Sequence, residues 1–347
     1  MPNTLLPYRA PALGLIAALG LATLLISPRP APAKKEGGLS VKKIAYGGWK
    51  NNLLISNGDA ELIVTLDVGP RVISYKLTGG KNVFKEFADQ MGKTGGKEWK
   101  SYGGHRLWIG PEDLTRTYYG DNGRVKYKEI DGGIRFTPGP ETEYGMQKEI
   151  DIKLAPSGSK VTLVHRISNF GNKETELAPW ALTVMAPGGI EVIPLPPHHP
   201  HPGPPQNAKS PKDYAASFNM SVWPFTDFKD PRWNFGTNYI TLQQQPNKGP
   251  TKIGLGHDQG WVGYLNGGTL FVKRFDLQEG KTYPDRGCNF ETFTNEEMLE
   301  METLGPVQKL GSKAAVEHTE AWELYKDVPA FKSEKEIDKE ITGRVKK

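Results

Sequence analysis

The sequence predicts an all-β protein, a large antiparallel β-sandwich with few helices. Forty glycines and 28 prolines among 347 residues, without a repeating period, indicate many turns rather than long helices. Segments in which apolar and polar residues alternate recur along the chain, and turn sequences bound them. No long stretch shows the 3.6-residue apolar period of an amphipathic helix.

The expected strands can be followed in chain order. Two β-branched runs separated by a Gly-Pro pair occupy residues 61–80. Residues 150–168 predict a hairpin turned at Ser-Gly-Ser, and residues 261–275 predict a second hairpin turned at Asn-Gly-Gly. The last expected strand lies within residues 314–325. One face of this strand carries Val316, His318, Glu320 and Trp322.

Residues 40–328 are expected to form a single domain. The proline-rich stretch 194–213 cannot lie in a central strand. We interpret it as a long loop within the domain, because similar strand patterns resume after it. Residues 329–347 are expected to be a charged tail, or a short surface helix in which three branched apolar residues recur every four positions.

The N-terminus has the pattern of a secretory signal peptide over residues 1–33. A weakly basic start leads into the apolar run 12–26, and small residues two apart precede the first lysines. This predicts a secreted or periplasmic protein that has no membrane contact after cleavage. The alternative is a retained N-terminal membrane anchor, although the run is short for the roughly 20 residues of a membrane span.

The net charge and the cysteine content argue against nucleic-acid binding and against catalysis by a cysteine. The net charge is +5, and it falls to +3 once the two arginines of the first 33 residues are removed, which is too weak and dispersed to predict nucleic-acid binding. Cys288 is the only cysteine, so no disulfide stabilises the fold, and we expect a buried structural thiol rather than a nucleophile. We expect a monomer without cofactor.

The segment "YGGHRLWIGPED" (102–113) is a candidate sugar site. Its aromatic ring at Trp108 offers a flat apolar face, and Arg106 offers a rigid donor fork. His105 and Glu112 are groups able to transfer protons. The alternative is a turn between strands, with Trp108 in the core and the charges in water.

A second candidate is the acidic segment 285–306. If "MLEMETL" is a strand, Glu300 and Glu302 share one face, and Met301 and Thr303 share the other. Carboxylates in apolar surroundings have raised pKa values and can act as acid or base. The alternative is an edge strand whose acidic face is solvated.

Two further segments have weaker signals. Residues 221–236 interleave aromatic residues, Trp233 among them, with charged ones, which suits either a loop lining a groove or a local hydrophobic cluster. His198, His199 and His201 lie in the proline-rich loop, where a metal site is disfavoured because no carboxylate follows nearby. We therefore expect no metal.

Several stretches together resemble the galactose mutarotase-like superfamily of aldose 1-epimerases, most closely an uncharacterised bacterial branch with a domain of unknown function. The resemblance runs roughly from residue 43 to residue 326. It rests on "LDVGPRVISY", "GGHRLWIGPED", "ISNFGNKETELAPWALTVM" and "LEMETLGPVQKLG…VEHTEAWELY". It implies the supersandwich fold and a mono- or oligosaccharide as ligand, with no cofactor.

The resemblance also implies a mechanism, in which a glutamate base and a histidine acid open and close the sugar ring. Glu302 matches the position of the base, and Arg106 matches a residue that holds sugar hydroxyls. Where these epimerases carry the acid histidine, this chain has Trp180 and Ala181. His105 is then the nearest candidate acid. Two functions stay open: an epimerase-like enzyme, or a glycan-binding module without catalysis.

Overall fold

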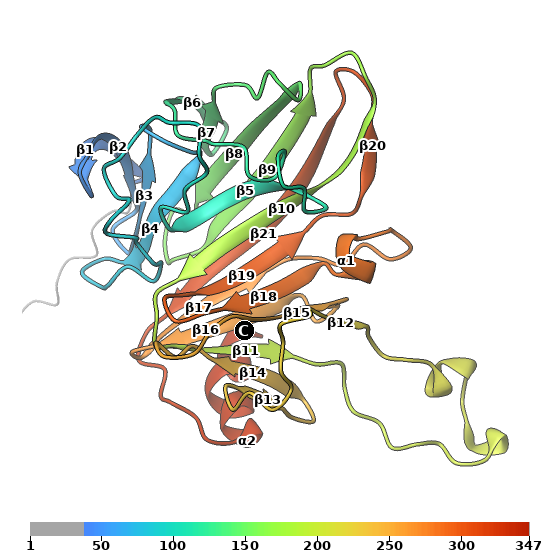
Figure 1. Cartoon of the computed structure of the whole chain (residues 1–347). Coiled ribbons are helices and arrows are strands. Elements are labelled where there is room, and N and C mark those ends of the chain that lie inside the picture. Colours follow the sequence, from blue (N-terminus) through green and yellow to red (C-terminus); the bar gives the residue numbers. More distant parts are fainter. Residues whose placement is uncertain (1–37, 347) are drawn as a thin grey trace, which may run out of the picture. The chain divides into compact units, whose positions relative to one another are not determined.

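The computed structural model describes residues 38–346, which form two antiparallel sheets packed face to face (Figure 1). The expected signal peptide at residues 1–33 lies outside the described residues. The first sheet has eleven strands. Their spatial order is β1 (Ser40–Tyr46), β2 (Trp49–Ser56), β3 (Ala60–Thr65), β4 (Arg71–Leu77), β5 (Gly104–Gly110), β10 (Thr175–Met185), β19 (Leu299–Leu304), β18 (Phe290–Thr294), β15 (Thr251–Leu255) and β12 (Met220–Val222), with β20 (Gln308–Leu310) paired to β10.

The second sheet has ten strands. Their spatial order is β13 (Trp233–Phe235), β14 (Tyr239–Gln243), β11 (Ile190–Pro194), β16 (Trp261–Asn266), β17 (Thr269–Arg274), β21 (Ala315–Tyr325), β9 (Val161–Asn169), β8 (Met146–Leu154), β7 (Gly133–Pro138) and β6 (Val125–Ile130). The predicted antiparallel β-sandwich is confirmed. Both expected hairpins form, as β8–β9 and as β16–β17.

The main core lies between the two sheets and follows the alternation of each strand. On β21 every second residue is buried, which is the face that the sequence predicts for Val316, His318, Glu320 and Trp322. On β5 the core-facing residues are His105, Leu107 and Ile109. The opposite face of the eleven-stranded sheet is called here the outer face.

The proline-rich stretch is a long excursion between β11 and β12, as expected (Figure 1). It contains two short 3-10 turns, η1 (Pro205–Asn207) and η2 (Pro211–Tyr214). A one-turn helix, α1 (Pro284–Gly287), precedes β18. Among the described residues, no helix has the length and apolar character needed to cross a membrane.

The segment expected as a charged tail packs against the domain. It forms α2 (Glu334–Ile337), a π-helical turn η3 (Asp338–Thr342) and α3 (Gly343–Val345). Ile337, Ile341 and Val345 are buried in a second apolar cluster with residues of β11, β14, β16 and β17. The four-residue spacing thus marks the buried stripe of a helix that covers the far face of the ten-stranded sheet.

Candidate sugar site on the outer face

Strand pairing places charged side chains in one row across the outer face. Arg106 on β5 and Glu302 on β19 are both register partners of Leu182 on β10. Glu302 in turn pairs with Glu291 on β18, and Glu291 pairs with Gly254 on β15. Because paired residues point to the same side of a sheet, segments far apart in sequence contribute to a single surface.

Lys252, Glu291 and Glu302 form a charged triad at one end of this row. Lys252 Nζ lies 2.7 Å from Glu291 Oε2 and 2.9 Å from Glu302 Oε2. Trp180 Nε1 donates a third hydrogen bond, of 2.9 Å, to the same Glu302 oxygen. Both side-chain hydrogen bonds of Glu302 within the described residues therefore use Oε2. Its Oε1 is available to a ligand.

The triad shares one positive charge between two buried carboxyl groups. Burial raises the pKa of Glu302 and raises that of Glu291 well above its ordinary value, although the Lys252 ammonium opposes both shifts. Burial disfavours the charge on Lys252 as well, but the two carboxylates outweigh this and raise its pKa. Glu291 is therefore the carboxyl group that burial biases more strongly toward its protonated form, and the Lys252 ammonium contacts both carboxyl groups.

Arg106 lies at the other end of the row, over aromatic rings. Its guanidinium carbon is 4.3 Å from the ring centre of Trp108, and its Nη2 donates to Glu300 Oε1 at 2.9 Å. Trp108 packs edge-to-face on Trp180 at 5.2 Å and on Tyr118 at 5.0 Å. The aromatic contacts fix the plane of the guanidinium and so fix the direction of its free N–H groups.

Several buried polar atoms of this face have no hydrogen-bond partner in the described part of the chain. They are Arg106 Nε and Nη1, Trp99 Nε1 and Glu291 Oε1. A buried donor or acceptor without a partner costs about 1–3 kcal/mol, so native proteins rarely leave several of them together. Donors and an acceptor on one face match a ligand that carries hydroxyl groups.

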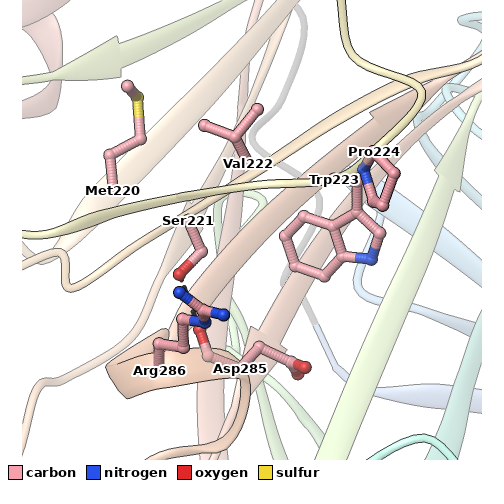
Figure 2. Close-up of a pocket in the computed structure, with 7 residues that line it drawn as sticks. All are labelled: Met220, Ser221, Val222, Trp223, Pro224, Asp285 and Arg286. Atoms are coloured by element: carbon pink, nitrogen blue, oxygen red, sulfur yellow. Dashed lines mark hydrogen bonds between the residues drawn. The ribbon is translucent and has the colours of Figure 1, made fainter.

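A hollow of about 500 Å³ lies beside β12 and α1 (Figure 2). Its walls are β12, the loop that follows β12, and α1. Trp223 belongs to this wall, and its ring centre lies 4.7 Å from Lys252 Nζ. The lining residues are Met220, Ser221, Val222, Trp223, Pro224, Asp285 and Arg286.

His105 lies on the core side of β5 and takes part in a second polar cluster. His165 Nδ1 donates to the carbonyl of His318 at 3.0 Å, so its Nε2 is the acceptor in the neutral ring. His105 Nε2 therefore donates to His165 Nε2 at 2.7 Å, and its Nδ1 accepts from Thr183 Oγ1 at 2.9 Å. Burial lowers the pKa of both histidines, which keeps the rings neutral.

The same cluster contains a buried ion pair. Glu320 Oε1 lies 2.9 Å from Lys273 Nζ, and Glu320 Oε2 accepts from Trp322 Nε1 at 3.0 Å. His105, His165 and Glu320 are the one group of described residues with metal-ligand spacing, since their ligand atoms all lie within 4.8 Å of one another. Hydrogen bonds already account for these atoms, and Lys273 supplies the positive charge. The chemistry favours a polar network over a metal site.

The structure thus separates residues that the sequence grouped together. Arg106, Trp108, Trp180 and Glu302 do meet on the outer face. His105 points to the opposite face of the sheet, because adjacent residues of a strand alternate. It does not stand across a pocket from Glu302.

Glu112 and Trp233 lie outside the row. Glu112 is exposed in the loop after β5, where Glu112 Oε1 accepts from Tyr118 Oη at 2.5 Å. Trp233 on β13 is buried in the core between the sheets, and its Nε1 donates to Thr251 Oγ1 at 2.9 Å. His198, His199 and His201 lie in the excursion before β12.

Comparison of the architecture with solved structures identifies the fold. A galactose mutarotase-like protein from Lactobacillus casei aligns over 79% of this chain and 100% of its own length, with a TM-score of 0.51 and 9% identity. The chain has the galactose mutarotase-like fold. A Klebsiella pneumoniae protein proposed to be an aldose 1-epimerase covers 89% of this chain and 87% of its own, with a TM-score of 0.52 and 10% identity.

A TPR-domain containing protein from Parabacteroides distasonis aligns over 81% of this chain, with a TM-score of 0.53 and 15% identity. This chain spans about half of that protein, 48% of its length. Protein-family profiles give no match. Curated proteins give none either. Identities this low establish the fold alone.

Sequence reasoning missed two members of the triad. Lys252 lies in "TKIGL" between Thr251 and Ile253, and a lone charge in a short β-branched strand was its only signal. Glu291 lies in the acidic segment 285–306, but nothing in the sequence shows that it faces Glu302 across a strand pair. Strand register is the missing information.

Proposed function

We propose that this protein binds a sugar on the outer face of the eleven-stranded sheet and catalyses proton transfer at its anomeric centre. The observation that carries the proposal is the pairing of Glu302 with Glu291 around Lys252. In the proposed mechanism Glu291 holds a proton and Glu302 is anionic, and the two groups lie side by side. The names of the Lactobacillus and Klebsiella neighbours, a mutarotase-like protein and a proposed aldose 1-epimerase, support a sugar as the ligand.

The chemistry requires one base and one acid close to a single carbon. Glu302 takes the proton of the anomeric hydroxyl while Glu291 gives its proton to the ring oxygen, and the bond between C1 and the ring oxygen breaks. Rotation about the C1–C2 bond and the reverse proton transfers close the ring as the other anomer. Both reacting oxygens are bonded to C1, so the acid and the base can come from adjacent strands on one face. Glu291 is fully buried, so the acid step requires the sugar to displace the side chains that cover it.

The remaining residues of the row bind rather than react. The free N–H groups of Arg106 donate to sugar hydroxyls, and the exposed 7% of Trp108, which packs against the buried Trp180, contacts the C–H face of the ring. Lys252 keeps Glu302 anionic. This arrangement assigns Glu291, in place of a histidine, to the acid step.

Binding without turnover is the second candidate function. It is favoured by the burial of Glu291 and Glu302 around Lys252, because an ion pair that already neutralises the base weakens its basicity. In that case the row recognises a glycan and performs no chemistry.

The test combines polarimetry with calorimetry on the intact chain. Pure α-anomers of common hexoses and pentoses are followed for mutarotation, and the same sugars are titrated calorimetrically. We expect acceleration above the buffer rate, a loss of at least 100-fold in Glu302→Gln, and weaker binding in Arg106→Met. Glu317→Gln, an exposed glutamate on β21, is the matched control.

The outcomes separate the two functions. Saturable heat without acceleration supports the glycan-binding module and removes the catalytic assignment. Acceleration that survives in Glu302→Gln overturns the role of the triad. No heat and no acceleration with any sugar overturns the whole proposal.

A further inference from the structure

The hollow beside β12 and α1 is larger than one sugar ring requires. Its volume of about 500 Å³ falls in the range of about 300–1,000 Å³ that holds drug-sized ligands. It lies at the free edge of the eleven-stranded sheet, because β12 pairs only with β15 there. A ligand made of several linked sugar rings can therefore extend past the edge of the sheet here.

Trp223 joins the hollow to the triad. Lys252 Nζ lies over the Trp223 ring at 4.7 Å, and the same ring lines the hollow (Figure 2). Thr226, three residues later, fixes this segment to β15, since Lys252 N donates to Thr226 Oγ1 at 2.9 Å. Trp223 is therefore held between the hollow and the triad.

Exposed apolar side chains concentrate in the chain segment that contains β12. Seven of the twelve large hydrophobic residues that are exposed in the described chain lie between residues 214 and 235. They are Tyr214, Phe218, Met220, Val222, Phe225, Phe228 and Phe235. Of these residues, Met220 and Val222 lie on β12 and line the hollow, and Phe225 lies in the loop that follows, whereas Phe235 belongs to β13 of the other sheet.

The turn at α1 supplies polar groups in a strained backbone. Asp285 and Arg286 have φ values of 48° and 68°, a region that side-chain-bearing residues rarely adopt. Ser221 Oγ, on β12, donates to the carbonyl of Asp285 at 2.7 Å and helps to hold this conformation. Strain of about 1–3 kcal/mol per residue persists mainly where position matters for function. Here it presents a carboxylate and a guanidinium to the hollow.

We infer that the hollow is a second sugar subsite, so that the ligand of this protein is an oligosaccharide or the end of a polysaccharide. Trp223 stacks on the second ring, and Asp285 and Arg286 bind its hydroxyls. Side chains of both charges beside an aromatic ring suit a neutral, hydroxyl-rich chain. The inference rests on the proposed function, because the first ring is the one held by the row of Arg106 and the triad.

A glycan microarray provides the first test. It displays each common hexose, pentose and uronic acid as the monosaccharide and as its linear tri- and tetrasaccharides, and hits are titrated calorimetrically. We expect oligosaccharides to bind about tenfold tighter than their monosaccharide, the size of one aromatic stacking contact. Trp223→Ala should abolish this ratio.

Two further variants keep the result interpretable if Trp223→Ala disturbs folding. Arg286→Gly removes the side chain while glycine accepts the φ of 68°, and it should lower the ratio of oligosaccharide to monosaccharide affinity. Phe170→Ala removes an exposed aromatic residue in the loop between β9 and β10, away from the edge, and should leave the ratio unchanged.

The outcomes distinguish a failure of the second subsite from a failure of the proposed function. Equal affinity for monosaccharides and oligosaccharides overturns the second subsite and leaves the proposed function standing. Binding of no glycan overturns both. Dimerisation in light scattering that Phe225→Ser abolishes, without any oligosaccharide preference, assigns the edge to a second copy of the chain and also overturns the subsite.

Discussion

His105 Nε2 and His165 Nε2 are 2.7 Å apart and join the two sheets by a hydrogen bond through their shared core. The bond depends on a neutral His165 ring, because His165 Nδ1 is already a donor to the carbonyl of His318 and its Nε2 must accept. A histidine pair in this position cannot serve a ligand on the outer face. The pair contributes to the stability of the β-sandwich.

A double-mutant cycle on this pair should show strong coupling. His105→Leu and His165→Leu each leave the partner's ring nitrogen buried and unpaired, so each should lower the free energy of unfolding by about 2–3 kcal/mol. The double variant should lose less than the sum, with a coupling of about 1–2 kcal/mol. Urea unfolding at pH 7 measures this. Strict additivity would contradict the inferred hydrogen bond.

The stability that buried His318 contributes should decrease when the pH falls below 6.5. Burial lowers the pKa of His318 to about 3, so between pH 6.5 and pH 3 the unfolded chain binds a proton that the folded chain does not. The stability that neutral His318 contributes is complete above pH 6.5, and about 2 kcal/mol of it is lost by pH 5.

His318→Gln should reduce this slope by about one proton, measured as the unfolding free energy between pH 7 and pH 5. The exposed His199 gives a matched control, because His199→Gln should leave the slope as it is in the parent chain. Identical slopes for His318→Gln and the parent would refute a neutral, buried His318.

The alternation in the sequence predicted which residues share a face of a strand, but it did not predict which strands pair with one another. Alternation in 314–325 placed His318 and Glu320 on one buried face, and alternation in 299–304 placed Glu300 and Glu302 together. The acidic strand was left open as an edge strand, yet β19 lies between β10 and β18, which is why its carboxylates are buried. Whether a strand is buried depends on its pairing with strands that are distant in sequence. The periodicity within one segment contains no information about that pairing.

The segment 102–113 shows how one local feature misleads. The sequence pattern grouped His105 and Arg106 in one candidate site, with a turn between strands as the alternative. The structure has β5 there, and alternation then sends His105 to the core and Arg106 to the outer face. Once the segment is known to be a strand, its residue order alone separates the two side chains.

Glu191 should make the protein less stable at alkaline pH. This glutamate on β11 is fully buried, and neither carboxyl oxygen has a hydrogen-bond partner among the described residues. Burial raises its pKa to about 8, so between pH 4.5 and pH 8 the folded chain retains a proton that the unfolded chain has lost. The stability present below pH 4.5 is therefore lost progressively up to pH 8, by up to about 5 kcal/mol.

Glu191→Gln should remove this loss, so its melting temperature should exceed that of the parent by a margin that grows from pH 5 to pH 8. Calorimetry at several pH values measures the margin. Glu112→Gln, at an exposed glutamate, should show no such trend. A margin that does not change with pH would mean that Glu191 is ionised in the folded protein.

Breaking the charged triad should cost more than removing it. Lys252→Met leaves the anionic Glu302 buried without its cation, and such a change lowers stability by about 3–5 kcal/mol. Adding Glu302→Gln removes the stranded charge, so the double variant should regain most of this loss. Lys76→Met, which breaks a partly exposed pair with Glu61, should change stability by no more than about 1 kcal/mol. Urea unfolding of the four chains at pH 7 distinguishes these cases, and a double variant less stable than Lys252→Met would show that Glu302 is protonated in the native state and that the base of the proposed reaction is absent.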